Sequence, residues 1–441
     1  MTLEDEVVAL RAEVAALRDA LAQAQERIAE LERRKTPPPA FVRPNTPPKG
    51  PATPRTKRAP EHNAGRKREV PTQIVPHALE RCPDCGYLLR GESVARRRQV
   101  IEVPAPAPAV ITEHRLLKRH CPVCDRWWTP RVDFGGQVLG QGRFGVRLVS
   151  LIAYLRQRAR LPYAAIQQVL ATLHGLRLSV GAIVDVLHRL QRATQAEQDA
   201  LLAQARASPI VHMDETGWRE RGQNGYVWGL VTPGPEPVCY YAYDRSRAGA
   251  VAAGLLADFA GYLVTDYYCA YNHLGCRHQR CWVHLLRDLH DLKQAHAADA
   301  AVVLWAQQVR ALYDDVQAAF AGSRVLTARQ RAQLARQLEA QAYRLAVVYA
   351  GHKKHPCRAL AKRLLRHMGE LFAFVRVDDL DADNNRAERL LRPVVVQRKI
   401  SGGTRSPAGS TTHLGLASLF QTWHLRGLNP FQECFSLLHS R

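Results

Sequence analysis

The chain has 441 residues, 46% of them hydrophobic, and a formal net charge of +22 at pH 7. This length predicts about two to four domains, and positive charge gathered in tracts favours a polyanionic partner over a merely basic surface. No apolar run reaches the roughly 18–20 residues of a membrane span, and the N-terminus lacks the basic-then-apolar order of a signal peptide. We therefore expect no membrane contact and a cytoplasmic protein.

The N-terminal segment carries a heptad repeat. Position a holds Val7, Val14, Leu21 and Ile28, and position d holds Leu3, Leu10, Leu17, Ala24 and Leu31. This pattern favours a parallel two-stranded coiled coil, so residues 1–35 are predicted to form a homodimer or a higher oligomer. The alternative is a single amphipathic helix packed against its own chain.

Residues 36–75 are rich in proline, which lacks a backbone N–H donor and fixes φ. We therefore expect a flexible linker. Its basic run Arg66, Lys67 and Arg68 either contacts phosphates or is simply solvated.

Two CxxC pairs follow, Cys82 with Cys85 and Cys121 with Cys124. Four thiolates on two tight turns can hold one tetrahedral Zn²⁺, so residues 76–135 are predicted to form a structural zinc module, with unligated cysteines as the alternative. The intervening residues 86–120 exceed the usual spacing, but their alternating pattern predicts a β-hairpin that brings the turns together. His120 is a possible substitute ligand.

Residues 140–205 have a helical pattern. An apolar stripe covers residues 143–158, Pro162 begins a second helix that Gly175 ends, and Ser179 caps a third. This arrangement is typical of a helix-turn-helix that binds DNA, although helix pairs also serve as plain packing units. The exposed basic residues of the third helix, Arg189 and Arg192, lie late in it, whereas base readout usually uses the first turns.

The composition changes from Pro209 onward, where the pattern predicts three strands, a helix and a fourth strand. This order matches the start of a ribonuclease-H-like fold, whose first and fourth strands are neighbours. Asp214 and Asp266, each after a short apolar run, are then expected side by side at strand ends. Trp218 either stacks on a base or fills the core.

The remainder of the predicted core, residues 206–425, contains a helical insertion at about residues 282–376 and a later helix that bears Glu388. The tail, residues 426–441, either packs or frays. The chain is thus predicted to be a multidomain α/β protein with a coiled coil, a zinc ribbon-like module, a helix-turn-helix-like segment and a catalytic core.

Three carboxylates, Asp214, Asp266 and Glu388, converge in this prediction. Carboxylate oxygens suit Mg²⁺ or Mn²⁺, and two such ions can drive phosphoryl transfer. Considered one at a time, each residue has an alternative to metal binding. Asp214 could be a turn residue with Glu215 as the ligand, Asp266 could cap the following segment, and Glu388 could pair with Arg392.

The helix bearing Glu388 is also basic, and guanidinium groups bind phosphates in a bidentate manner. We expect its cations to contact DNA: Arg386, Arg389, Arg392, Arg398 and Lys399. The run with Cys276, His278, Cys281 and His284 either contributes to a second zinc site or anchors the insertion to the sheet next to Asp266. In either case we expect His284 near the carboxylates.

Several motifs together resemble DDE transposases of the insertion-sequence-66 family. They are DET at 214–216, D-x-Y-x-x-Y at 266–271, CWVH at 281–284, NNRAERLLRP at 384–393 and RKISGG at 398–403. The resemblance implies that Asp214, Asp266 and Glu388 are catalytic and that Cys82, Cys85, Cys121 and Cys124 bind zinc. The family commonly has a basic residue shortly after CW-x-H, but here Arg287 stands one place off.

The expected function is that of a DNA transposase, a metal-dependent polynucleotidyl transferase and endonuclease. It would cut transposon ends and join their 3′-hydroxyls to double-stranded target DNA, with possible small accessory proteins. The alternative is a non-catalytic DNA-binding regulator derived from a transposase.

Overall fold

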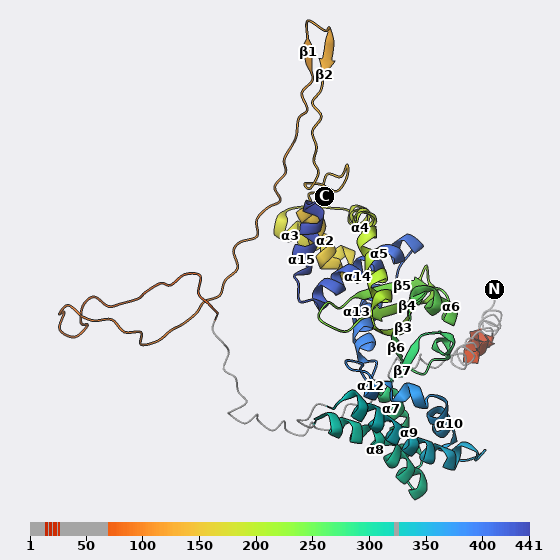
Figure 1. The fold of residues 1–441 in the computed structure, drawn as a ribbon. Helices are drawn as coiled ribbons and strands as arrows, with labels where there is room; N and C mark the ends of the chain where they lie inside the picture. Colours follow the sequence, from red (N-terminus) through yellow and green to blue (C-terminus); the bar gives the residue numbers. More distant parts are fainter. Residues whose placement is uncertain (1–13, 16, 20, 24, 27–68, 322–325) are drawn as a thin grey trace, which may run out of the picture. The chain divides into compact units, whose positions relative to one another are not determined.

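The computed structural model describes residues 14–15, 17–19, 21–23, 25–26, 69–321 and 326–441 (Figure 1). It divides into two compact units, residues 1–103 and 104–441. Most of the predicted coiled coil and residues 36–68 of the linker lie outside the described residues. Of the helices in the described part, none is long and apolar enough to cross a membrane.

A five-stranded mixed sheet organises the second unit. Its strands are β3 (Ile210–Glu220), β4 (Gln223–Val231), β5 (Cys239–Asp244), β6 (Tyr262–Thr265) and β7 (Arg277–Arg280). The order is β5-β4-β3-β6-β7, antiparallel from β5 to β3 and parallel from β3 to β7. The predicted neighbourhood of the first and fourth strands is therefore confirmed, and the sheet is consistent with a ribonuclease-H-like core.

Strand β3 is longer than the sequence pattern predicts. Its antiparallel pairing with β4 continues to Glu220 and closes through a tight turn at Arg221 and Gly222, which both have positive φ. The parallel pairing with β6 stops at His212. The prediction that Asp214 ends a strand is thus wrong, because the hairpin continues past it, but Asp214 lies just beyond the point where β3 leaves β6.

Strand β7 was not predicted as a strand. Its four residues, RHQR, are polar and do not alternate, so they carry no strand pattern of their own. They form a strand because each pairs in parallel with β6. The helical insertion covers this edge, which protects the unpaired backbone groups that an edge strand exposes.

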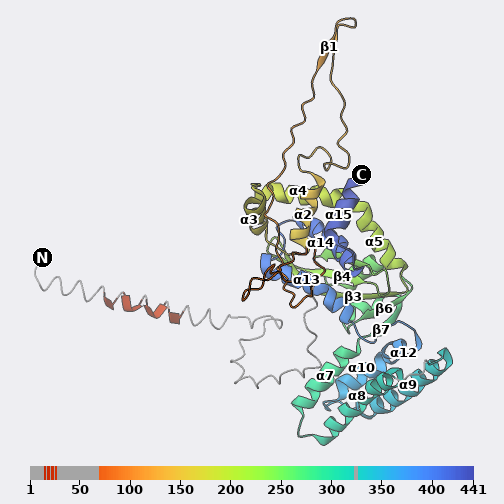
Figure 2. The same ribbon diagram turned by 90° about the vertical axis from the view of Figure 1, so that its left-hand side faces the viewer.

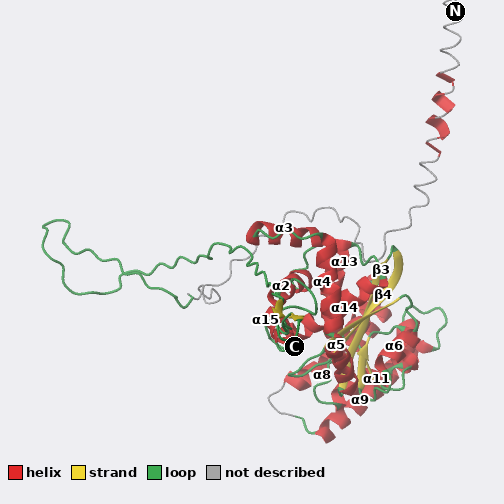
Figure 3. Ribbon diagram, turned by 90° about the horizontal axis from the view of Figure 1, so that it is seen from above, coloured by secondary structure: helices red, strands yellow, loops and turns green. Residues whose placement is uncertain are grey.

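Helices cover both faces of the sheet (Figure 3). Helix α6 (Gly249–Leu256) and the short 3₁₀ helix η2 (Cys269–His273) pack on one face, and α13 (Asn385–Ser401) and α14 (Pro407–Leu425) pack on the other. Trp218 lies in the second of these cores, is 2% exposed and stacks on His413. It therefore fills the core.

The helical insertion forms its own core beside β7 (Figure 2). Its helices are α7 (Trp282–Ala295), α8 (Ala300–Ala321), α9 (Ala328–Ala350), α10 (Arg358–Arg366), α11 (Met368–Leu371) and α12 (Ala373–Arg376). The core also includes Ile210 of β3 and Val264 of β6, so the insertion packs directly on the strands that lead to the two aspartates.

The helices before the sheet follow the predicted caps. They are α2 (Val146–Gln157), α3 (Tyr163–His174), α4 (Val180–Ala193) and α5 (Gln195–Ala207). Gly175 ends α3 with a φ of 64°, and the Ser179 hydroxyl accepts a hydrogen bond from the N–H of Ala182 at the start of α4.

The C-terminal tail is not frayed. It forms helix α15 (Pro430–His439), which packs on α2, and its Cys434 and Leu438 are buried in the core of α2–α5 and α14. The tail thus belongs to the helical layer before the sheet, although more than 200 residues separate them in sequence.

The predicted hairpin between the two cysteine pairs is wrong. Residues 89–118 contain no strand, and the hairpin present is the short pair β1 (Arg119–Cys121) and β2 (Arg126–Trp128). Pro104, Pro106 and Pro108 lie in the intervening stretch, and proline cannot donate to a strand ladder.

The packing of α15 leads to a stability prediction. Leu438→Ala should lower the free energy of unfolding by about 2–5 kcal/mol, because it leaves a cavity in a closed core. Leu425→Ala is the matched control, since Leu425 is 38% exposed and should cost little. Urea unfolding of the full chain measures both, and equal losses would contradict a packed tail.

Candidate active site

The pairing of β3 with β6 brings Asp214 and Asp266 together. His212 pairs with Val264, and each aspartate lies two residues further along the chain, Asp214 within β3 and Asp266 directly after β6. Because side chains alternate across a strand, extending this register places the two aspartates at equivalent positions on the same face of the sheet. They are 52 positions apart in sequence.

Glu215 points to the opposite face from Asp214. One of its oxygens accepts from the Arg247 guanidinium at 2.6 and 2.8 Å, and the other accepts from the Tyr271 hydroxyl. Both oxygens are thus occupied on the side of α6 and η2. Asp214 and Glu215 were the two alternatives for the metal ligand, and of these Asp214 is the carboxylate that faces α13.

Helix α13 carries Glu388 in its first turn, over the same face. The buried side chain of Asn384, the residue before α13, donates to the carbonyl of Met213 at 2.9 Å, which ties the start of the helix to β3 beside Asp214. Gly229 lies opposite Asp214 in β4, and a Cβ there would lie 3.0 Å from the Leu391 side chain. Glycine at this position therefore permits the close approach of α13.

The electrostatics of this cluster favour a cation. Burial, followed by repulsion from Glu215, Asp266 and Glu388, raises the pKa of Asp214 to about 8, although the Glu215 N–H opposes the shift. Oε1 of Glu388 is buried and has no hydrogen-bond partner among the described residues. His284 Nε2 lies 3.7 Å from it, too far for a hydrogen bond but as near as the sequence predicts.

These residues fit a hard divalent cation in chemistry. Their donors are carboxylate oxygens, which Mg²⁺ prefers, and positive charge would relieve the repulsion that raises the pKa of Asp214. Within the described part of the chain, however, no three His, Cys, Asp or Glu side chains are arranged as a ready-made metal site. The carboxylates are neighbours that have not converged on one point.

The predicted DNA-contacting cations of α13 fall into two groups. Arg389, Arg392 and Lys399 are exposed. Arg386 is also exposed but pairs with Asp381. Arg398 is half-buried and donates to the carbonyl of Gly217, so it ties the end of α13 to β3.

The four residues considered for a second metal do not assemble. His278 Nε2 lies 3.1 Å from the carbonyl oxygen of Leu274, and Cys276 Sγ is 4.0 Å from the same nitrogen. Cys281 is buried and its sulfur accepts from the N–H of Asn384, whereas His284 lies beside Glu388. The run instead connects β7 to the insertion and to α13.

Each cysteine pair forms a tight turn within its own unit. In the first unit, Gly86 N–H donates to the carbonyl of Cys82, and in the second, Cys121 ends β1 just before Cys124. Backbone N–H groups of the second cysteine and of its preceding residue lower the pKa of Cys82 and of Cys121. Such lowered thiol pKa values favour the thiolate that binds zinc.

Sequence reasoning missed Arg280, the last residue of β7. Its side chain is 1% exposed and contacts Thr265, Asp266, Asn272 and Glu370. The available signal was an arginine two residues before the helix start at Trp282, but a run of Cys and His around it pointed to metal instead.

Glu370 is the ionic partner of Arg280. Burial alone would raise the pKa of Glu370, but hydrogen bonds from His367 and Arg280 lower it to about 2 from an ordinary 4.5. The Glu370 carboxyl therefore stays ionised in the folded protein at pH values well below those at which an ordinary glutamate is protonated.

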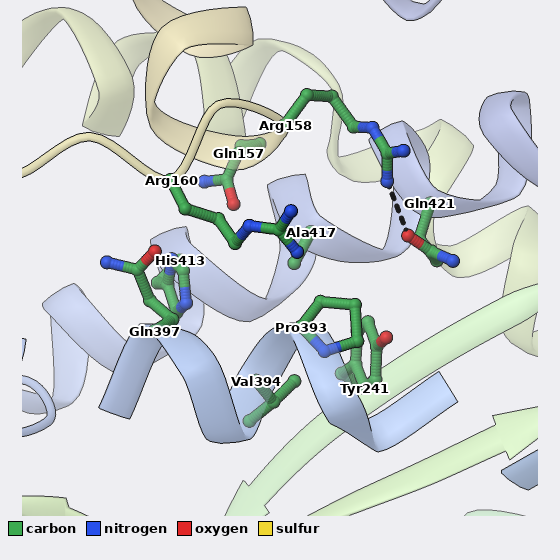
Figure 4. A pocket seen from close by; sticks show the side chains of 10 residues that line it. All are labelled: Gln157, Arg158, Arg160, Tyr241, Pro393, Val394, Gln397, His413, Ala417 and Gln421. Carbon is green, nitrogen blue, oxygen red and sulfur yellow. Dashed lines mark hydrogen bonds between the residues drawn. The ribbon is translucent and has the colours of Figure 1, made fainter. Parts of the chain in front are cut away.

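A separate small pocket lies between the end of α2, α13 and α14 (Figure 4). Its cavity volume is about 20 Å³, and Arg158 donates to Gln421 Oε1 at 2.7 Å beside it. Its lining comes from the end of α2, from α13, α14 and β5, and contains no carboxylate: Gln157, Arg158, Arg160, Tyr241, Pro393, Val394, Gln397, His413, Ala417 and Gln421. It is distinct from the carboxylate cluster.

The sequence model of the family described as "Transposase IS66 family" matches residues 141–412. This chain belongs to that family. The match spans the sheet, the insertion and all three carboxylates. The description of the family names transposases, which as a class are enzymes that act on DNA and generally use divalent metals.

Two relatives of the IS66 protein come from Sinorhizobium fredii. The uncharacterized protein y4qI is 25% identical over 64% of this chain and 57% of its own length. The uncharacterized protein y4jD is 25% identical over 81% of this chain and 74% of its own length. The chain thus spans little more than half of the first relative.

Among solved structures, the chain is similar to one titled as a simian T-cell lymphotropic virus intasome in complex with PP2A regulatory subunit B56 gamma. The likeness covers 40% of this chain and 70% of that one, at 14% identity and a TM-score of 0.14. With so low a score, the strand order of the sheet remains the basis for describing the fold.

The Arg280–Glu370 pair predicts a pH-dependent stability. Glu370→Gln should destabilise the protein most above about pH 5 and progressively less toward about pH 2. The lowered pKa means that folding favours the ionised carboxylate, and this stabilisation is fully present only at pH values where the carboxyl of the unfolded chain is also ionised. Urea midpoints of wild type and variant at about pH 7 and pH 3 measure this. A difference that stays constant between the two pH values would contradict it.

Proposed function

We propose that this IS66 protein is a DDE transposase that performs metal-dependent cleavage at transposon ends and transfers the resulting 3′-hydroxyls to target DNA. The observation that carries the proposal is the position of Asp214, Asp266 and Glu388. They come from three separated segments and flank the same face of the sheet, where burial and then the neighbouring carboxylates, Glu215 first among them, raise the pKa of Asp214.

The proposed roles follow from how each carboxylate is held. Asp214 is fixed within the β3–β4 hairpin and Asp266 at the end of β6, while Glu388 reaches in from the first turn of α13. Divalent ions bound by these oxygens would activate the attacking water or 3′-hydroxyl and stabilise the leaving oxygen. The carboxylates would orient the ions, and the start of α13 would be kept in place by Asn384.

Exposed cations on α13 are proposed to hold the DNA strand. Arg389 and Arg392 lie one to four residues beyond Glu388 on the same helix, and neither has an ion-pair partner among the described residues. Guanidinium groups at that position can contact phosphates on either side of a scissile bond. Arg386 and Lys399 would extend this contact along the helix.

The flanking segments are proposed to recognise and pair the DNA ends. Residues 140–205 would contact transposon-end DNA, where Arg192 is exposed and Arg189 pairs with Asp185. Residues 1–35 would join two protomers, so that two ends are held together. Accessory proteins remain possible partners, and the cytoplasm is the proposed compartment.

The central test is a single substitution at Glu388. Glu388→Gln should lower Mg²⁺-dependent cleavage of DNA from the flanks of this reading frame by about 100-fold or more, because the bound metal supplies several kcal/mol of transition-state stabilisation. Binding of the same DNA, measured by mobility shift, should persist. Glu433→Gln in α15 is the matched control and should cleave as wild type does.

The outcomes separate the two candidate functions. Undiminished cleavage by Glu388→Gln would remove the carboxylate assignment. A wild-type protein that binds the ends but cuts them neither with Mg²⁺ nor with Mn²⁺ would favour the non-catalytic regulator.

We also propose that Cys82, Cys85, Cys121 and Cys124 bind one structural Zn²⁺. Elemental analysis of reduced protein should find about one zinc per chain, and Cys121→Ser should reduce it, because a tetrahedral site loses one thiolate. Cys239→Ser is the control, since Cys239 is buried in the sheet core. A zinc content unchanged by Cys121→Ser would contradict the site.

A further inference from the structure

We propose that Arg280 is a positioning residue for Asp266, and that through it the helical insertion controls the geometry of the carboxylate cluster. This inference rests on the proposed function. In the proposed function, Arg280 contacts neither DNA nor an oxygen that binds metal. It contacts the backbone of Asp266, whose side chain carries such an oxygen.

Arg280 lies at the junction of three elements. It ends β7 and pairs with Thr265, the last residue of β6. Its buried guanidinium donates to Glu370 Oε2 at 2.6 Å, to Asn272 Oδ1 at 2.8 Å, to the Asp266 carbonyl at 3.0 Å and to Thr265 Oγ1 at 3.1 Å. Every nitrogen of the guanidinium thus has an acceptor.

These contacts hold Asp266 where the sheet no longer can. The β6–β7 ladder ends at Thr265, whose carbonyl accepts from the N–H of Cys281 at 2.9 Å. Beyond that point, Arg280 binds the Asp266 carbonyl, and the N–H of Tyr268 binds Asp266 Oδ1 at 2.8 Å. The residue is therefore fixed at its backbone and at one carboxylate oxygen, which leaves the other oxygen for a cation.

A guanidinium is suited to this place and an ammonium is not. Four acceptors on β6, η2 and α11 surround Arg280 in directions that a planar fork of five N–H donors can meet at once. Lysine has three donors at one point. Burying either charge is costly, and here the Glu370 carboxylate compensates it.

The same network connects Asp266 to the insertion. Glu370 lies in α11, where His367 also contacts it at 2.9 Å. The neighbours of Arg280 make parallel connections, since Gln279 Oε1 accepts from the N–H of Phe374 at 2.8 Å and the Trp282 indole donates to the carbonyl of Leu371 at 2.6 Å. The insertion thus holds β7 through Gln279 and Arg280, and of these two residues Arg280 is the one that also binds Asp266.

The test is Arg280→Lys in the full chain, with Mn²⁺ as the probe. Calorimetric titration should show active-site Mn²⁺ bound about 10-fold or more weakly, because changing a group that orients a metal ligand typically costs 10–100-fold in affinity or activity. The binding heat that wild type shows and Asp214→Asn lacks is assigned to Mn²⁺ bound at the active site. Cleavage should slow by about 10–100-fold, need more Mg²⁺ for half-maximal rate, and recover partly at high Mg²⁺.

Arg331→Lys provides the matched control. Arg331 is a poorly exposed arginine of α9 that donates to the backbone carbonyls of Phe374, Val375 and Val377. It stabilises the same insertion without contacting the carboxylates. Arg331→Lys should lose stability but keep wild-type Mn²⁺ affinity and Mg²⁺ dependence. If the role of Arg280 were merely structural, Arg280→Lys would behave in the same way.

Thr265→Val is a milder variant for the case in which Arg280→Lys does not fold. It changes side-chain volume little but removes the hydroxyl that accepts from Arg280 and itself donates to the Asp266 carbonyl at 3.1 Å, so it should weaken Mn²⁺ binding in the same direction by a smaller factor. Unchanged Mn²⁺ affinity and Mg²⁺ dependence in the folded Arg280 variant, or in Thr265→Val if that variant alone folds, would overturn the inference while leaving the proposed function intact. A wild type without any Asp214-dependent Mn²⁺ binding would overturn both.

Discussion

The parallel pairing of β3 with β6 is the constraint on which the site depends. Three consecutive residue pairs, ending at His212 and Val264, set the register that carries two aspartates from distant parts of the chain to the same face of the sheet. A shift by one residue would turn one aspartate to the opposite face, because side chains alternate along a strand. Hydrophobic burial on both faces holds the register, with Val211 and Leu263 in one core and Ile210 and Val264 in another.

A buried group of like charges opposes folding, and the structure limits that cost in two ways. Glu215, adjacent to Asp214, is turned to the other face, where it pairs with Arg247 and accepts a hydrogen bond from Tyr271. Asp214 itself has a raised pKa, so the cluster need not carry its full negative charge in the absence of a cation. Binding energy from a divalent ion would then be used to assemble the carboxylates into one coordination geometry.

Helix α13 and the helical insertion approach the aspartates from different sides. The contact of α13 depends on the absence of a side chain at Gly229 and on the amide of Asn384, both next to Asp214. The insertion contacts Asp266 through β7. The buried Arg280–Glu370 pair holds Asp266 directly after the point where the hydrogen bonds between β6 and β7 end. The placement of the carboxylates therefore depends on these specific contacts between elements. Apolar packing supplies most of the stability.

The sequence by itself determined the first four strands along the chain, the helix caps at Gly175 and Ser179, the helix that bears Glu388 and the IS66 family, because hydrophobic period, cap chemistry and short motifs are local properties. It predicted the neighbourhood of Asp214 and Asp266 through the expected sheet order. Only the tertiary structure decided that β3 continues past Asp214, that RHQR is a strand, that the tail packs on α2 and that Arg280 binds Asp266. These features depend on partners distant in sequence: a polar tetrapeptide pairs because β6 lies beside it, and a buried arginine is stable because acceptors from three elements surround it.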